Sequence, residues 1–185
     1  MSKVALIGCP NYELNQVKTA LMRGFSYFGG VKNIFQNKKR ILLKPNLLTG
    51  EKIEKAVTTH PSLLQGITEI LLENDFFCGY GDSPGFGSLE TVAKKAGIYT
   101  PLKNLKIEVV DFVGKKEVSY AKALQNRQFT IAKGLFNYDA LLSLPTVSYT
   151  HLRAHETVLD LVCRLLLEKK NNPPPPPPPP PHICP

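Results

Sequence analysis

Polar side chains that could bind or transform a small molecule follow two apolar runs of the sequence. Lys44 and Asn46 follow the run 41–43, and Asp82 and Ser83 follow the run 76–80; Asp111 stands near the end of a further run, 107–112. An ammonium group can bind an anion, and a carboxylate can hold a cation or accept a hydrogen bond from a hydroxyl group. If the two runs are parallel strands of one sheet, we expect these side chains at its carboxyl edge, where ligands bind in α/β folds.

The second of these places lies in a glycine-rich segment, residues 81–88, with the sequence GDSPGFGS. It joins the apolar run to a helical pattern, so its backbone N–H groups could face an anion. It is not a dinucleotide fingerprint, because after Gly79 and Gly81 the third glycine would be needed at position 84, which is Pro84. It is not a P-loop either, because no lysine follows Gly87. Two interpretations stay open: a turn with a helix cap, or an anion-binding or catalytic turn that includes Gly85.

The other candidate side chains also allow two interpretations each. Lys44 either pairs with Asp82 or binds an anionic group, and Asn46 either caps a turn or hydrogen-bonds a ligand. His60 either caps the helix that begins at Pro61 or serves in proton transfer or metal binding. A single histidine without a neighbouring Cys/His set is a weak indication of metal. We therefore expect no metal site.

The surrounding pattern alternates apolar runs with amphipathic stripes. Spacing of three and four residues predicts helices within 14–28, 61–71 and 89–96. Residues 114–128 form either a hairpin or a loop. Units of roughly 30 residues favour a parallel sheet with right-handed crossovers. We expect an α/β fold with a mostly parallel sheet and helices on both faces, Rossmann-like and truncated. The runs interpreted as strands are 4–7, 40–44, 76–80, 107–112, 129–132 and 138–145.

Composition limits the partners that we expect. The chain has 185 residues, 23 Lys and Arg, 15 Asp and Glu, and a net charge of +8. This charge indicates a solvated surface or attraction of anionic ligands. No basic run alternates with aromatic residues, so we expect no specific nucleic-acid partner. No run reaches the roughly 20 apolar residues of a membrane helix, and no signal peptide is visible, so we expect no membrane partner and a cytoplasmic location. The oligomeric state stays open.

The end of the sequence differs in kind from the rest. Residues 147–156 resemble a translated transposase-type sequencing adapter, and residues 160–167 resemble the end of the same adapter. Residues 157–159 fit a sample index, 168–170 fit a run of A, and the prolines 173–181 fit a run of C. We therefore expect an incomplete α/β domain at 1–145 and an artefactual tail at 146–185. No function is assigned to His151, His155 or the polyproline run.

Three motifs resemble the family called domain of unknown function 362: ILLKPNLL at 41–48, AVTTHP at 56–61 and GDSPG at 81–85. The resemblance covers about residues 3–145. Members often carry ferredoxin-type iron–sulfur modules further along the chain. The resemblance therefore implies iron–sulfur clusters in a longer protein, with no cofactor in this chain.

Two functions follow as expectations. The first is a domain that binds a small anionic molecule and that its family resemblance relates to redox chemistry. The second is a non-catalytic ligand-binding or scaffold module. An enzymatic activity is not assigned. The candidate ligand-binding residues are Lys44, Asn46, His60, Asp82, Ser83 and Gly85.

Overall fold

A computed structural model describes residues 3–110 and 112–146, which belong to one compact unit, Met1–Thr146. The tail expected at 146–185 lies outside the described residues from 147 onward, and with it the proline run. Asp111, expected among the polar side chains at the strand ends, also lies outside the described residues. Among the described residues, no helix is long and apolar enough to cross a membrane.

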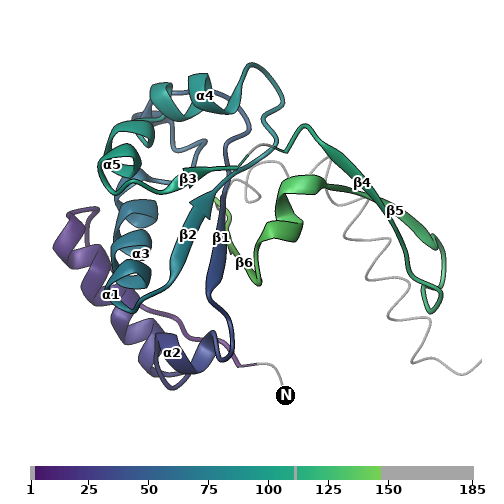
Figure 1. Ribbon diagram of the computed structural model, residues 1–185. Helices are drawn as coiled ribbons and strands as arrows, with labels where there is room; N and C mark the ends of the chain where they lie inside the picture. Colours follow the sequence, from purple (N-terminus) through teal and green to yellow (C-terminus); the bar gives the residue numbers. More distant parts are fainter. Residues whose placement is uncertain (1–2, 111, 147–185) are drawn as a thin grey trace, which may run out of the picture. The chain divides into compact units, whose positions relative to one another are not determined.

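The core is a four-stranded sheet with the strand order β3-β2-β1-β6 (Figure 1). Its strands are β1 (Arg40–Pro45), β2 (Phe77–Tyr80), β3 (Glu108–Val109) and β6 (Ala140–Leu144). All three strand pairings are parallel. The prediction of an α/β fold with a mostly parallel sheet is therefore confirmed.

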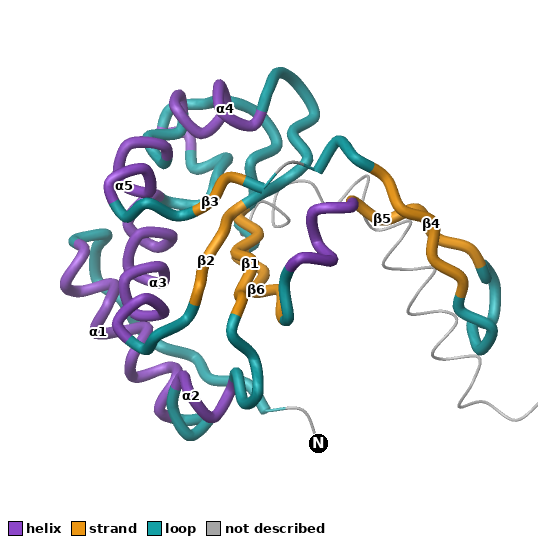
Figure 2. Tube along the Cα trace, viewed as in Figure 1, coloured by secondary structure: helices purple, strands orange, loops and turns teal. Residues whose placement is uncertain are grey.

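Helices connect the parallel strands (Figure 2). Along the chain, helix α3 (Pro61–Glu73) connects β1 to β2. Helices α4 (Leu89–Lys95) and α5 (Tyr99–Asn104) connect β2 to β3. Helix α1 (Leu14–Ser26) packs on α3, where a Cβ at Gly66 would meet side chains of α1 at 3.3–3.5 Å. Short helical segments complete the set: α2 (Val31–Ile34), η1 (Ile53–Lys55) and η2 (Lys133–Asn137).

Strand β1 is covered on both faces, which explains its unbroken apolar sequence. Ile41 and Leu43 belong to the core that the helices cover, and both are fully buried. Leu42 alternates to the opposite face, where it lines a small cavity with Leu135 of η2. Helical segments thus cover both faces of β1: α-helices on one and η2 on the other, here called the second face.

Gly79 of β2 allows a tyrosine to cross the second face of the sheet. A Cβ at this position would lie 2.0 Å from the hydroxyl oxygen of Tyr138 and 2.9 Å from Cγ2 of Val110. Because real Cβ atoms do not approach other atoms so closely, only glycine fits here without a shift. The glycine in β2 therefore permits close packing of Tyr138 on the sheet.

One predicted strand is wrong, and one alternative that the sequence left open is decided. The strand expected at 4–7 is wrong, because this segment is extended but pairs with no described strand, and Val4 and Leu6 are 91% and 98% exposed. An apolar run becomes a strand only where another strand accepts its backbone hydrogen bonds. Of the two alternatives for the region 114–128, a hairpin or a loop, the structure shows the hairpin. Strand β4 (Lys115–Ser119) pairs antiparallel with β5 (Gln128–Ala132) in a separate two-stranded sheet.

Candidate functional site

An ion pair joins the carboxyl ends of β1 and β2. Lys44 stands next to last in β1, and Asp82 follows two residues after β2 ends. The Lys44 Nζ atom lies 2.7 Å from Oδ1 of Asp82, whose side chain is 8% exposed against 39% for Lys44. Of the two interpretations of Lys44, the structure shows the pairing with Asp82. An ammonium group has three donors, so one carboxylate contact leaves donors for another partner.

Asp82 is held in place from two sides. Its Oδ2 atom accepts a hydrogen bond of 2.7 Å from the backbone N–H of Leu47. The preceding Gly81 donates its N–H to the carbonyl oxygen of Leu43 at 3.1 Å. A Cβ at Gly81 would lie 2.6 Å from the carbonyl oxygen of Val110. The glycine thus lets the chain pass close to β3 and sets the direction in which Asp82 leaves the strand.

Asn46 holds the loop after β1 in place. Its side-chain amide donates to the carbonyl oxygen of Val57 at 3.0 Å and to Oγ1 of Thr146 at 2.6 Å. Its backbone N–H donates to Oγ1 of Thr59 at 2.8 Å. Both amide hydrogens therefore have partners within the chain, as the turn interpretation expects.

His60 caps helix α3. Its Nδ1 atom accepts a 3.2 Å hydrogen bond from the backbone N–H of Ser62, and Pro61 occupies the first helical position. The imidazole stacks on the ring of Tyr12, with 3.8 Å between ring centroids and 16° between planes. Burial lowers the pKa of His60. A lowered pKa favours the neutral imidazole, the form in which Nδ1 can accept a hydrogen bond.

The glycine-rich segment combines a turn with a cap. Gly85 donates its backbone N–H to the carbonyl oxygen of Leu48 at 2.9 Å. Ser88 accepts a hydrogen bond of 3.2 Å from the N–H of Thr91 and so caps α4. Ser83 is exposed to solvent directly after Asp82. The turn-and-cap interpretation thus accounts for Gly85 and Ser88.

Thr59 is a residue of this site that the sequence interpretation missed. It is 2% exposed, and its hydroxyl donates to the carbonyl oxygen of Leu144 at 2.7 Å while it accepts from Asn46. One hydroxyl thus ties the end of β1 to the end of β6. The available signal was the pair Thr58-Thr59, which places two hydroxyl side chains directly before His60.

The structure gathers Lys44 and Asp82 into one ion pair, with the loop of Asn46 fixed beside them through Leu47. His60 belongs to the same loop but is engaged by Ser62 and Tyr12. Ligand binding by these residues stays a prediction.

Comparison with known protein families identifies the family of this chain. Residues 41–158 match the model of the family described as Domain of unknown function (DUF362). The chain belongs to this family. The match includes the three motifs that carried the resemblance, and it extends to residues 147–158, which the adapter interpretation assigns to the tail.

A curated relative of this DUF362 chain is the thylakoid-associated protein sll1697 of Synechocystis sp. The two sequences are 28% identical over 145 residues, which are 78% of this chain and 44% of the relative. The chain therefore spans less than half of the length of the relative. No solved structure matches it.

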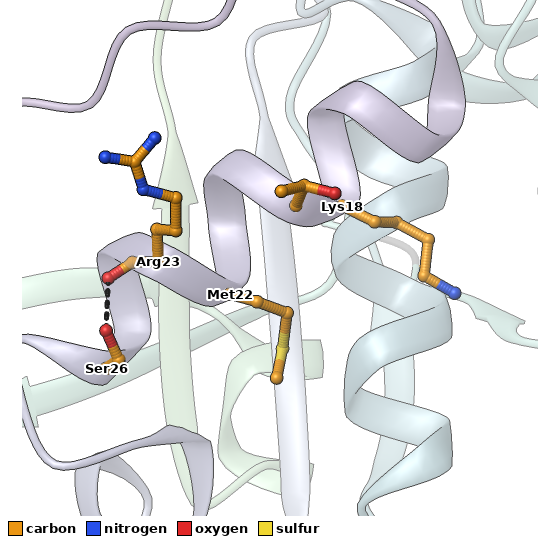
Figure 3. A pocket seen from close by; sticks show the side chains of 5 residues that line it. Lys18, Met22, Arg23 and Ser26 are labelled. Atoms are coloured by element: carbon orange, nitrogen blue, oxygen red, sulfur yellow. Dashed lines mark hydrogen bonds between the residues drawn. The ribbon is translucent and has the colours of Figure 1, made fainter.

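A shallow hollow of this DUF362 chain lies on helix α1, away from the strand ends. It is a shallow groove of about 460 Å³ along α1, lined by Lys18, Thr19, Met22, Arg23 and Ser26 (Figure 3). Lys18 is held by Glu69 and Glu73 of α3 at 2.9 and 2.8 Å. A groove lined by a single helix and without convergent polar groups lacks the features of a ligand pocket.

Among the residues that the structure describes, no group of three or more His, Cys, Asp and Glu side chains could hold a metal ion. Cys78 of β2 is buried, and burial raises the pKa of its thiol to about 12. A thiol of this kind stays protonated and behaves as a small apolar side chain.

Proposed function

We propose that this DUF362 domain binds a small anionic molecule at the carboxyl edge of β1 and β2, with Lys44 as the charged contact. One observation carries the proposal: a partly exposed ammonium group is held 2.7 Å from a buried carboxylate that is itself anchored by the N–H of Leu47. A side chain fixed in this way loses little further conformational entropy on binding. An anion bound there meets a cation that is already in position.

The remaining candidates have two roles in this proposal. The exposed hydroxyl of Ser83 is a neutral donor next to Asp82, and Gly85 keeps the turn free of side-chain bulk. Asn46 and His60 position the loop and helix α3, because their polar atoms already have partners in the chain.

Titration of the full chain with inorganic phosphate, followed by calorimetry, tests the proposal. Lys44→Ala should weaken binding about tenfold or more, the effect of losing a charge-assisted hydrogen bond. Lys52→Ala, which removes an exposed lysine from the following loop, is the matched control and should bind normally. Lys44→Arg keeps the charge and the partner of Asp82, and circular dichroism verifies that each variant is folded. Undiminished binding by Lys44→Ala would refute the proposal.

A scaffold or non-catalytic ligand-binding module is the second candidate. The observation that favours it is the internal pairing of Asn46 and His60, which removes two of the six candidate groups from direct contact. Loss of stability without loss of phosphate binding in Asn46→Ala separates a positioning role from ligand contact.

We further propose that the longer protein carries iron–sulfur clusters and that the domain is linked to redox chemistry. The resemblance to the family supports this proposal, and the relative is more than twice as long as the segment matched here. The complete gene tests it: a downstream array of cysteines with ferredoxin-type spacing supports the redox proposal. A complete gene without such an array overturns it.

We also propose that residues 146–185 are translated sequencing adapter. The support is the in-frame correspondence of residues 147–170 with an adapter, followed by nine consecutive prolines, 173–181. Resequencing the locus beyond the Pro145 codon from a fresh DNA preparation tests it. Genomic DNA that encodes 147–170 would show that this part of the chain is authentic.

The cytoplasmic location stays a prediction. The name of the relative associates that protein with thylakoids. Fractionation of cells into soluble and membrane parts, followed by immunodetection, tests the location of this chain.

A further inference from the structure

The β4–β5 hairpin has two unlike faces. In its register Val118 lies opposite Phe129, and Lys116 lies opposite Ile131. Tyr120 continues this face, because its N–H donates to the carbonyl oxygen of Arg127 at 2.8 Å. Side chains alternate between faces along a strand, so one face is apolar and basic. The opposite face carries Lys115, Glu117, Ser119, Gln128, Thr130 and Ala132.

The apolar face is open to solvent among the described residues. Tyr120 is 56% exposed and Phe129 41%, and Leu124 in the connecting turn is 91% exposed. The two strands pair only with each other in the described part of the chain. An exposed cluster of large apolar side chains on a small ribbon indicates an interaction surface.

The charge of the hairpin indicates the kind of partner. Residues 115–133 contain five Lys and Arg and a single acidic residue, Glu117, which gives a net charge of +4. Lys122 and Arg127 stand on either side of Leu124 in the sequence, and both are exposed. The partner surface must therefore be anionic and must also accept an aliphatic side chain.

We propose that the β4–β5 hairpin docks on an anionic membrane surface, with Leu124 inserted among the lipid headgroups and Lys122 and Arg127 on the lipid phosphates. This proposal revises the expectation of no membrane partner, which rested on the lack of a membrane-spanning run and does not apply to surface docking. An anionic leaflet attracts nearby basic side chains, and its interface removes an apolar side chain from water. Tyrosine suits the same interface, because its ring is apolar and its hydroxyl is polar. Nucleic acid would match the charge, but it gives an exposed leucine no comparable apolar site.

Co-sedimentation of the full chain with lipid vesicles tests this proposal. The chain should bind vesicles of phosphatidylglycerol and phosphatidylcholine, and should not bind vesicles of phosphatidylcholine alone. Lys122→Ala should weaken binding about fivefold, the contribution of one basic residue near an anionic surface. Leu124→Ser should weaken it about tenfold through loss of apolar insertion. Added salt should release the protein, because exposed charges are screened.

Two matched controls separate the effect of the hairpin from a general loss of charge or of an exposed leucine. Lys115→Ala removes the same charge from the opposite face of the hairpin and should have the smaller effect. Leu6→Ser removes a leucine that is 98% exposed outside the hairpin, and it should bind like the unaltered chain. Equal binding of Leu124→Ser and the unaltered chain would overturn the proposal. So would binding to single-stranded oligonucleotides without binding to anionic vesicles.

Discussion

Two clusters of charged side chains lie on the sheet, and they are built from similar groups in different surroundings. At the carboxyl edge, Lys44 and Asp82 approach within 2.7 Å, and Asp82 is buried. On the second face, Arg40 and Glu108 are 3.4 Å apart, with side chains 44% and 58% exposed. Tyr138 joins this second cluster by donating its hydroxyl to Glu108 at 2.8 Å and by lying beneath the guanidinium of Arg40.

The difference in burial decides what each cluster contributes. An exposed ion pair gains little, because water solvates the separated charges almost as well. A buried carboxylate has lost its water, so each hydrogen bond that it accepts has no replacement if it is broken. We therefore expect the carboxyl edge to depend on its polar contacts and the second face to depend on its packing.

Asp82→Ala tests the buried side of this comparison and should have the largest effect. It leaves the N–H of Leu47 without its partner and Lys44 without its counter-ion. We expect the free energy of unfolding to fall by about 3 kcal/mol in urea denaturation, mostly from the buried N–H, because water reaches Lys44. Asp82→Asn keeps an acceptor for Leu47 and should lose about half as much. A cost no larger than that of an exposed pair would remove the distinction between the clusters.

Gly79→Ala tests packing on the second face. The new methyl group would overlap the Tyr138 hydroxyl, and we expect a loss of about 2 kcal/mol in the free energy of unfolding. Adding Tyr138→Phe removes the closest atom and should restore part of the loss. Gly8→Ala, which has no neighbour within 4 Å of its Cβ position, should be neutral in the same assay. Equal stability of Gly79→Ala and Gly8→Ala would contradict the packing argument.

The sequence predicted the strand, the helix starts and the ion pair around the carboxyl edge better than it predicted the contacts on the second face. The continuous apolar run Ile41-Leu42-Leu43 indicated a strand, and the helix starts at Pro61 and Leu89 followed from their caps. These features are local, because a cap or an apolar run is encoded in adjacent residues. The joint position of Lys44 and Asp82 followed from the expectation that parallel strands end at one edge of a sheet.

Features that depend on distant residues were not visible in the sequence. The run Val4-Ala5-Leu6-Ile7 has the composition of a strand, but a strand also needs a neighbour, which no local pattern supplies. The contact of Gly79 with Tyr138 joins residues 59 positions apart, and the role of Thr59 depends on Leu144. Composition indicates that a segment can pair or pack, and the fold decides with what.

The dependence of stability on pH should also separate the two regions. Burial lowers the pKa of His60 below 6.5, so the unfolded chain takes up the proton first, and stability should fall as pH drops below about 6.5. Backbone N–H donors of Arg40 and Lys39 lower the pKa of Asp139 below 3.8. Its contribution is present at neutral pH and should be lost only as pH falls below about 4.

Urea denaturation across the pH range measures both steps. His60→Gln should remove only the loss of stability that begins near pH 6.5, here called the upper step. Asp139→Asn should remove only the loss that begins near about pH 4, the lower step. An upper step that persists unchanged in His60→Gln would assign it to another group.

Glu108→Gln tests the exposed cluster and should have the smallest effect. It removes the charge that faces Arg40 but keeps an oxygen that can accept the hydrogen bond of Tyr138. We expect the free energy of unfolding to change by less than about 0.5 kcal/mol, since both charges of this pair are solvated. Any residual loss should disappear in high salt, which screens exposed charges. A loss as large as that of Asp82→Ala would show that the cluster is desolvated in solution, and that burial does not separate the two regions.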